Sequence, residues 1–201
     1  VALSAGVTSA PVLTAGTRMN KVAHCLYVIP PNTDVIVKQG VLQLAVPSGP
    51  RGLRLPLYIL FSSLAREQGE RSSAVVLSGV GSDGTLGMHS VKAMGGLTAA
   101  QQPDTAEFDA MPRSAIEASC VDSVATPSEL PARILAYISN IPKARKAGAD
   151  AVGEIGDLAI STVQDIVKLL QLRTKHDFSL YKPSTLNRRI ERRMAVHGLT
   201  T

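Results

Sequence analysis

Asp83 is the first residue in this chain whose surroundings suggest chemistry. It follows an apolar run, residues 74–77, that is typical of a buried parallel strand, and a helical pattern comes after it. Gly81 and Gly84 flank it and allow a sharp turn and a close approach of the backbone. In open α/β sheets, ligands and catalytic groups gather beyond the carboxyl ends of the strands. Asp83 is therefore a candidate catalytic residue, although an aspartate at a helix start can also serve only as an N-cap or dipole partner.

A second interpretation of the same turn is a dinucleotide-binding fingerprint. Gly79, Gly81 and Gly84 give the pattern G-x-G-x-x-G after a strand, and Asp104 lies about 20 residues further on. We disfavour this interpretation because no βαβ unit begins before the strand. Asp104 also falls in a polar loop after a proline, away from any strand end.

Four ordered motifs favour the catalytic interpretation. They are residues 26–34 (LYVIPPNTD), 76–87 (VLSGVGSDGTLG), 95–98 (GGLT) and 106–116 (AEFDAMPRSAI). Together they resemble the catalytic domain of CheB-type protein-glutamate methylesterases, over about residues 7–141. The resemblance implies a doubly wound, mostly parallel α/β sheet. It also implies hydrolysis of glutamyl methyl esters on chemoreceptors, with deamidation of certain glutamines as a side activity.

The same resemblance assigns roles to two residues of the turn. It places the catalytic aspartate at Asp83, which would orient a histidine and stabilise the imidazolium. It also gives the backbone N–H of Val80 to the oxyanion hole, where the donor faces the charge that develops on the ester carbonyl. The chain departs from the family at Tyr58, where an aspartate is usual.

The nucleophile and the base of the family are not expected in this chain. In the family, the serine lies in a G-A-S-A-G-G turn after the first strand, and both it and the histidine lie upstream of the motif at 26–34. Ser4 resembles that turn only superficially, because no strand precedes it. The four histidines are expected to be structural or solvated: His24, His89, His176 and His197. We therefore expect the 201-residue chain to be inactive by itself.

Composition bounds the remaining possibilities. Hydrophobic residues make up 45% of the chain, which is enough for a core, yet no apolar run reaches the roughly 18 residues of a membrane span. The start of the chain has no basic-then-apolar signal pattern. Cys25 and Cys120 have no metal-binding spacing and are interpreted as reduced thiols. These features predict a cytoplasmic protein without membrane insertion and without a metal.

Hydrophobic patterning predicts the order of the elements. Strands are expected at 25–29, 35–37, 41–44, 74–77, 97–100 and 121–125, and helices at 57–68, 85–94, 112–118 and 129–138. Residues 142–153 have the small and charged composition of a linker. We therefore expect a partial methylesterase domain over 1–141 and a small helical module over 154–201.

The charge of the chain is confined to its last part. Residues 1–141 hold 10 Lys/Arg and 10 Asp/Glu, whereas residues 142–201 hold 11 and 6, so the net charge of +5 lies entirely after residue 141. On a helix, Leu186, Ile190 and Met194 share one face. Four arginines occupy the positions between them: Arg188, Arg189, Arg192 and Arg193.

This basic helix resembles the N-terminal helical subdomain of CheR-type receptor methyltransferases. The resemblance implies that the four arginines contact the acidic helical methylation region of a methyl-accepting chemoreceptor. The alternative is that they are simply solvated surface charges. Nucleic-acid binding is disfavoured because no aromatic residues alternate with the arginines for base stacking.

The order of the two resemblances is that of CheB–CheR fusion proteins of bacterial chemosensory systems. The S-adenosylmethionine-binding domain would follow Thr201, so no cofactor is expected on the residues present. An alternative from another class is a non-catalytic receptor-binding or scaffolding module that keeps the enzyme fold only as a platform.

Overall fold

The computed structural model describes residues 10–20, 24–47, 49–50, 54–140, 156–178 and 180–199. The chain divides into two compact units, Val1–Leu130 and Pro131–Thr201, and each is described by itself. The predicted linker at 142–153 lies outside the described residues.

Two small sheets open the first unit. Their strands are β1 (Val12–Thr14), β2 (Arg18–Asn20), β3 (Leu26–Val28), β4 (Asp34–Lys38) and β5 (Val41–Ala45). β1 pairs in parallel with β3, and β5 pairs antiparallel with both β2 and β4. Gln39 and Gly40 connect β4 to β5 with positive φ angles of 51° and 75°, as a type I′ hairpin turn requires. The sequence pattern predicted β3, β4 and β5 but not β1 and β2.

A third, fully parallel sheet carries the candidate site. Its strands are β6 (Ser73–Val76), β7 (Leu97–Gln101) and β8 (Ser123–Ala125), in the order β6-β7-β8. The helix α2 (Asp83–Ala93) connects β6 to β7, and α3 (Ala110–Glu117) connects β7 to β8. Short 3₁₀ helices lie at Gly69–Arg71 and Pro103–Thr105. The predicted parallel α/β architecture is confirmed for this part of the chain.

Several predicted boundaries in this region were wrong. β8 begins at Ser123, two residues after the predicted start. β6 ends at Val76, and Leu77 beyond it is 47% exposed, because the chain turns away from the sheet there. α2 begins at Asp83 and α3 at Ala110, each two residues before the predicted start. Gly84 and Pro112 suggested later starts, but both residues are tolerated in a first helical turn, where N–H groups have no intrahelical partner anyway.

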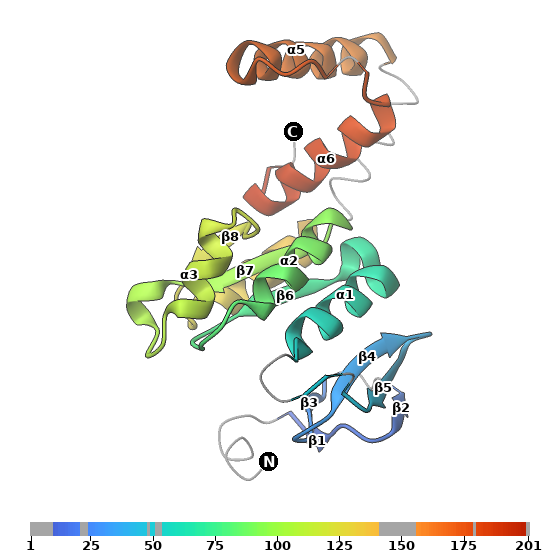
Figure 1. Cartoon of the computed structure of the whole chain (residues 1–201). Coiled ribbons are helices and arrows are strands. Elements are labelled where there is room, and N and C mark those ends of the chain that lie inside the picture. Colours follow the sequence, from blue (N-terminus) through green and yellow to red (C-terminus); the bar gives the residue numbers. More distant parts are fainter. Residues whose placement is uncertain are drawn as a thin grey trace. The chain divides into compact units, whose positions relative to one another are not determined.

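The helix α1 (Pro56–Gln68) lies between the parallel sheet and the β4–β5 hairpin (Figure 1), and it packs against an apolar cluster on each side. One cluster belongs to the parallel sheet and includes Phe61 and Ala65 from α1 with their neighbours Ala74, Val76, Met88, Val91 and Ala100. The other consists of Val35, Val37 and Leu42 from the hairpin, against which Leu64 packs. Leu60 packs against both clusters, so α1 is buried on two sides.

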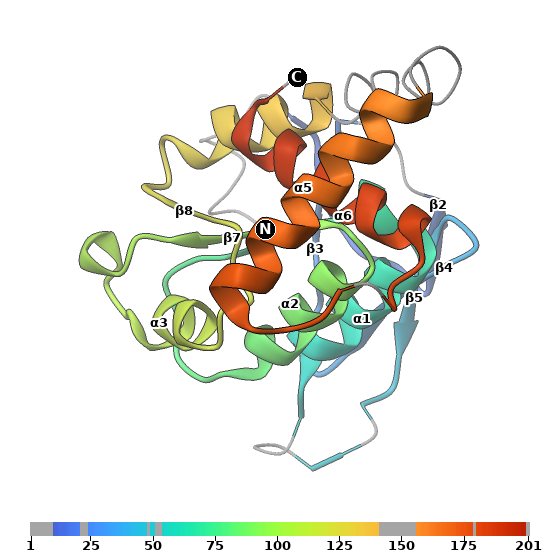
Figure 2. The same cartoon turned by 90° about the horizontal axis from the view of Figure 1, so that it is seen from above.

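α1 and α2 lie side by side in both views (Figures 1 and 2), and at Gly87 the two helices are in close contact. A Cβ atom at Gly87 would lie 2.7 Å from Cβ of Phe61 and 3.1 Å from the carbonyl oxygen of Leu57. Since real Cβ atoms do not approach so closely, only glycine fits between these two helices without a shift.

The second unit is helical. It contains a helix over residues 130–140, which begins at the end of the first unit, α5 (Gly156–Thr174) and α6 (Pro183–His197). α6 ends at Gly198 in the left-handed conformation, with φ of 69°. The predicted helical character of this part of the chain is confirmed.

Candidate active site

Asp83 stands where the first turns of two helices meet. It is the first residue of α2, and its Oδ2 accepts a hydrogen bond of 3.1 Å from the backbone N–H of Leu57. Leu57 is the second residue of α1, so this N–H has no partner within its own helix. The positive ends of both helix dipoles favour a carboxylate at this point. The Asp83 side chain is partly buried, and one of its two oxygens is engaged by α1.

The turn after β6 presents a backbone donor. Gly79 donates its N–H to the carbonyl of Phe108 at 2.8 Å and accepts the N–H of Met111 at 3.0 Å. Gly81 has a φ of 95°, which glycine adopts without strain. Within the parts of the chain that the structure describes, the N–H of Val80 has no hydrogen-bond partner. It is therefore available to a ligand, as an oxyanion donor must be.

A buried amide at the end of β7 holds the start of this turn. Oε1 of Gln101 accepts the N–H of Ser78 at 2.8 Å, and Nε2 donates to the carbonyl of Thr105 at 2.8 Å. Oγ of Ser78 accepts the N–H of Phe108 at 2.9 Å. Neither Gln101 nor Ser78 was singled out from the sequence. The available signal was a polar residue directly after the apolar strand pattern at 97–100.

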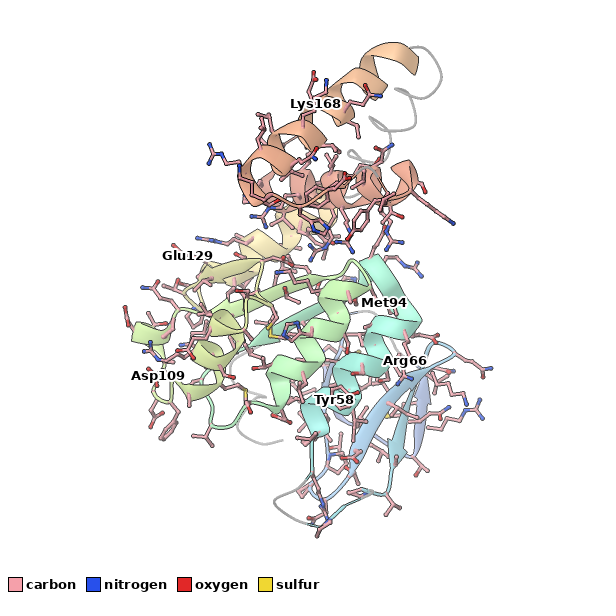
Figure 3. The ribbon with its side chains drawn as sticks, turned by 45° about the horizontal axis from the view of Figure 1, so that its top comes forward. Tyr58, Arg66, Met94, Asp109, Glu129 and Lys168 are labelled. Carbon is pink, nitrogen blue, oxygen red and sulfur yellow. The ribbon has the colours of Figure 1, made fainter. Side chains whose placement is uncertain are left out.

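The loop that leads into α3 is held by an ion pair. Nη2 of Arg113 lies 2.6 Å from Oδ2 of Asp109, and this hydrogen-bonded charge lowers the pKa of the Asp109 carboxyl (Figure 3). Deeper in the unit, the Oγ atoms of Thr85 and Ser114 lie 2.9 Å apart and link α2 to α3. The ion pair lies within the first turn of α3, and the bond from Met111 to the carbonyl of Gly79 joins α3 to the turn that contains Val80.

The histidines are dispersed over the molecule. His24 precedes β3 with a φ of 61°, and His89 lies on α2; both are exposed, as predicted. Residues three and four apart on a helix are neighbours, and His89 follows Asp83 by six positions, so α2 carries the two side chains on different faces. His176 and His197 are exposed residues of the second unit. Ser4 lies outside the described residues.

Exposed apolar side chains come from the same segments that build this site. They are 40% to 70% exposed: Tyr58 of α1, Val80 of the turn, Leu86 of α2 and Phe108 before α3. Tyr58 follows Leu57 directly and lies in the first turn of α1 (Figure 3). An aromatic ring thus lies one residue from the N–H that Asp83 accepts.

The basic helix has the predicted arrangement of faces. On α6, Leu186, Ile190 and Met194 are partly buried, whereas Arg188, Arg189 and Arg193 are exposed and Arg192 is partly buried. The loop before α6 contains an aromatic cluster. The ring centroid of Phe178 lies 4.9 Å from that of His176 and 5.8 Å from that of Tyr181.

Two further properties concern the described residues as a whole. Among them, no group of three or more His, Cys, Asp or Glu side chains is placed to hold a metal ion. In the same residues, every helix is too short or too polar to cross a membrane.

Comparison with protein families gives two matches in order along the chain. The CheB methylesterase family matches residues 2–134, and the all-alpha domain of CheR methyltransferases matches residues 161–201. The crystal structure of the Thermotoga maritima CheB methylesterase catalytic domain is similar, with a TM-score of 0.55 and 24% sequence identity. This similarity covers 60% of this chain and 66% of that one, and it supports the fold.

Two relatives illustrate the extent of the similarity. An uncharacterized 104.1 kDa protein of Rhodobacter capsulatus is 38% identical over 206 residues, which is 94% of this chain but 22% of that protein. A putative protein-glutamate methylesterase/protein-glutamine glutaminase of Leptospira interrogans is 36% identical over 100 residues, 49% of this chain and 52% of that protein. The chain thus spans about a fifth and about half of these relatives. The family match over residues 2–134, together with the parallel fold that contains Asp83, shows that this chain belongs to the CheB methylesterase family.

Proposed function

We propose that the first unit is a protein-glutamate methylesterase module of a chemosensory system, linked to a receptor methyltransferase module. Its substrate would be the glutamyl methyl esters of a methyl-accepting chemoreceptor, with glutamine deamidation as a possible second reaction of the same site. The observation that carries this proposal is the N–H of Val80, which has no partner among the described residues and lies three residues before Asp83, in a chain of this family.

The chemistry needs four parts. A nucleophilic hydroxyl attacks the ester carbonyl, a histidine takes the hydroxyl proton, and that proton then passes to the departing methoxide, which leaves as methanol. Water afterwards hydrolyses the acyl-enzyme. In this scheme, Asp83 would orient the histidine and stabilise its charged form, and the Val80 N–H would stabilise the oxyanion of the tetrahedral intermediate.

Asp83 and Val80 supply only two of these four parts. The 201-residue sequence contains no G-A-S-A-G-G turn, and among the described residues neither His24 nor His89 is hydrogen-bonded to Asp83. We therefore propose that this polypeptide, prepared alone, does not hydrolyse receptor esters. The serine and the histidine would have to be supplied by the full-length gene product.

The basic helix α6 would bind the receptor. Arg188, Arg189, Arg192 and Arg193 are proposed to contact the acidic helical methylation region of a cytoplasmic receptor domain, consistent with the CheR all-alpha match over this part of the chain. S-adenosylmethionine would belong to a methyltransferase catalytic domain and not to the residues of this chain.

A non-catalytic scaffolding role is the second candidate. It is favoured by the hydrogen bond between Asp83 and the Leu57 N–H, since this contact gives Asp83 a structural purpose without any reaction. In that case the methylesterase fold would serve only to present the basic helix to its receptor.

Methanol release from a methylated receptor separates the two candidates. We expect the full-length gene product to release methanol, and the 201-residue chain and an Asp83→Asn full-length variant to stay near background. A full-length protein that binds the receptor without releasing methanol is a scaffold, and serine-dependent release by the 201-residue chain contradicts the proposed division of the site.

A further inference from the structure

We propose that Gln101 is a positioning residue for the oxyanion hole, and that it acts by fixing Ser78 and thereby the direction of the Val80 N–H. This inference rests on the esterase function proposed above and adds a residue to it. In this proposal Gln101 does not contact the substrate, and its effect on the reaction passes through the backbone of the turn.

The surroundings of Gln101 leave its amide one orientation. The side chain is buried, with 5% of its surface exposed, so both ends of the amide need partners. Oε1 faces a donor, the N–H of Ser78, and Nε2 faces two acceptors, the carbonyl and Oγ1 of Thr105 at 2.8 Å and 3.2 Å. A flipped amide would place two donors together at Ser78 and two acceptors together at Thr105.

Gln101 thereby joins two loops at the carboxyl end of the parallel sheet. Ser78 belongs to the loop after β6, whereas Thr105 belongs to the loop after β7, so one buried side chain bonds both. The second loop also reaches back, because Phe108 donates its N–H to Oγ of Ser78 and accepts the N–H of Gly79. Of the two residues immediately before Val80, Ser78 is therefore held at its backbone N–H and its side-chain Oγ, and Gly79 at its backbone N–H and carbonyl.

This fixation matters because an oxyanion donor must be in place before charge develops. Preorganised N–H groups stabilise the intermediate without reorganisation, and a displacement of about 1 Å at a reacting group can cost about 100-fold in rate. Val80 itself is held by no hydrogen bond in the described residues, so its direction is set by Ser78 and Gly79.

The first test measures the turn itself in the 201-residue chain. The Gln101→Met substitution, made in ¹⁵N-labelled protein, removes the hydrogen bonds of the side-chain amide to Ser78 and Thr105 and keeps the side chain at nearly the same size. We expect the Ser78 and Val80 amide resonances to shift and hydrogen exchange at Ser78 to accelerate at least tenfold. Thr98→Val is the matched control, since Thr98 is equally buried on β7 and its Oγ1 bonds to Asp122 at 2.8 Å, away from the turn. It should leave both resonances in place.

The second test measures methanol release by the full-length gene product. Gln101→Met should lower kcat by about 10- to 100-fold and leave KM within about twofold, whereas Thr98→Val should leave both nearly unchanged. Gln101→Glu keeps an oxygen facing the Ser78 N–H but buries a charged oxygen against the Thr105 carbonyl, so it should lower kcat as well. Unshifted amide resonances outside the turn show that the Gln101→Met protein is folded.

The outcomes distinguish this inference from the function on which it rests. An active wild type whose Gln101→Met variant keeps its kcat, or whose Ser78 and Val80 amides do not move, overturns the role of Gln101 alone. A wild type that releases no methanol overturns the proposed function, and with it the catalytic role of Gln101, whatever the amide resonances show.

Discussion

Asp83 Oδ2 lies 3.1 Å from the backbone nitrogen of Leu57, and this hydrogen bond connects the first turn of α2 to the first turn of α1. The aspartate that we propose as catalytic is therefore also a capping residue, but for the neighbouring helix and not for its own. The two roles use the same carboxylate and can be separated by substitution.

The free energy of unfolding should differ between the Asp83→Ala and Asp83→Asn variants. Alanine removes the acceptor of the Leu57 N–H, so the free energy of unfolding should fall by about 0.5–2 kcal/mol, as at other capping positions. Asparagine retains an oxygen in the same place and should cost much less. Urea unfolding of the 201-residue chain measures both. Asp104→Ala, at an exposed carboxylate, is the control, and equal losses for the two Asp83 variants contradict the capping role.

Activity should respond to Asp83→Asn quite differently from stability. In the full-length gene product, an asparagine cannot stabilise the imidazolium, so kcat for methanol release should fall by about 10⁴-fold if the triad operates. The measurement is the initial rate with a methylated receptor at saturating concentration. A decrease of less than about threefold means that Asp83 is a cap and no more.

Gly87→Ala tests the contact between α1 and α2. In an ordinary helix interior this change stabilises by about 0.5–1 kcal/mol, but here the new Cβ would lie 2.7 Å from Cβ of Phe61. We expect instead a loss of about 1–3 kcal/mol, because the helices must move apart. His89→Ala, at an exposed position of the same helix, should change stability by less than about 0.5 kcal/mol. A stabilised Gly87→Ala protein would show that the helices separate freely.

Charge reversal on α6 tests the proposed receptor contact. Arg189→Glu together with Arg193→Glu should weaken binding of a labelled peptide from the receptor methylation region, mainly by slowing association. Wild-type affinity should fall steeply with added salt, because exposed charges are screened over about 8 Å at physiological ionic strength. The matched reversal at Lys38 and Arg66, both exposed on the first unit, should have little effect. Binding that is insensitive to salt, or equal losses from both pairs, leaves the arginines as solvated surface.

The two cysteines should differ in reactivity. Burial raises the pKa of the Cys120 thiol, which lies in the core with Sγ 3.1 Å from the Ala115 carbonyl, so its reactive thiolate is scarcer at any given pH. Cys25 is only partly buried. With a disulfide reagent at pH 8, we expect one thiol to react at once and the second only on unfolding. A Cys25→Ser protein should retain the slow thiol alone, and fast labelling of that variant contradicts the assignment.

The sequence predicted the features that depend on neighbouring residues. The apolar strand before Asp83, the glycine turn and the helix after it follow from local patterns, and they account for where Asp83 and Val80 lie. β1 and β2 have three residues each, and unlike the equally short β3 they do not lie within a longer apolar run such as residues 25–29. Their existence depends on pairing with β3 and β5.

The connections within the site could not be predicted in this way. The bonds from Gln101 to Ser78 and from Asp83 to Leu57 join residues 23 and 26 positions apart. They depend on the register of β6 against β7 and on the packing of α1 against α2, which local propensity does not determine. The positions of the proposed functional residues could thus be predicted from the sequence, but the contacts that orient them could not.

The burial of α1 on two sides has a consequence for how the first unit loses its structure. Leu60 packs against both apolar clusters, and Oγ of Ser63 accepts the N–H of Val37 from the hairpin at 3.0 Å. If either the hairpin or the parallel sheet separates from α1, apolar surface of that helix becomes exposed to water. The two should therefore unfold together as a single cooperative unit. We expect the slowest amide protons of the hairpin and of the parallel sheet to exchange with the same free energy of opening.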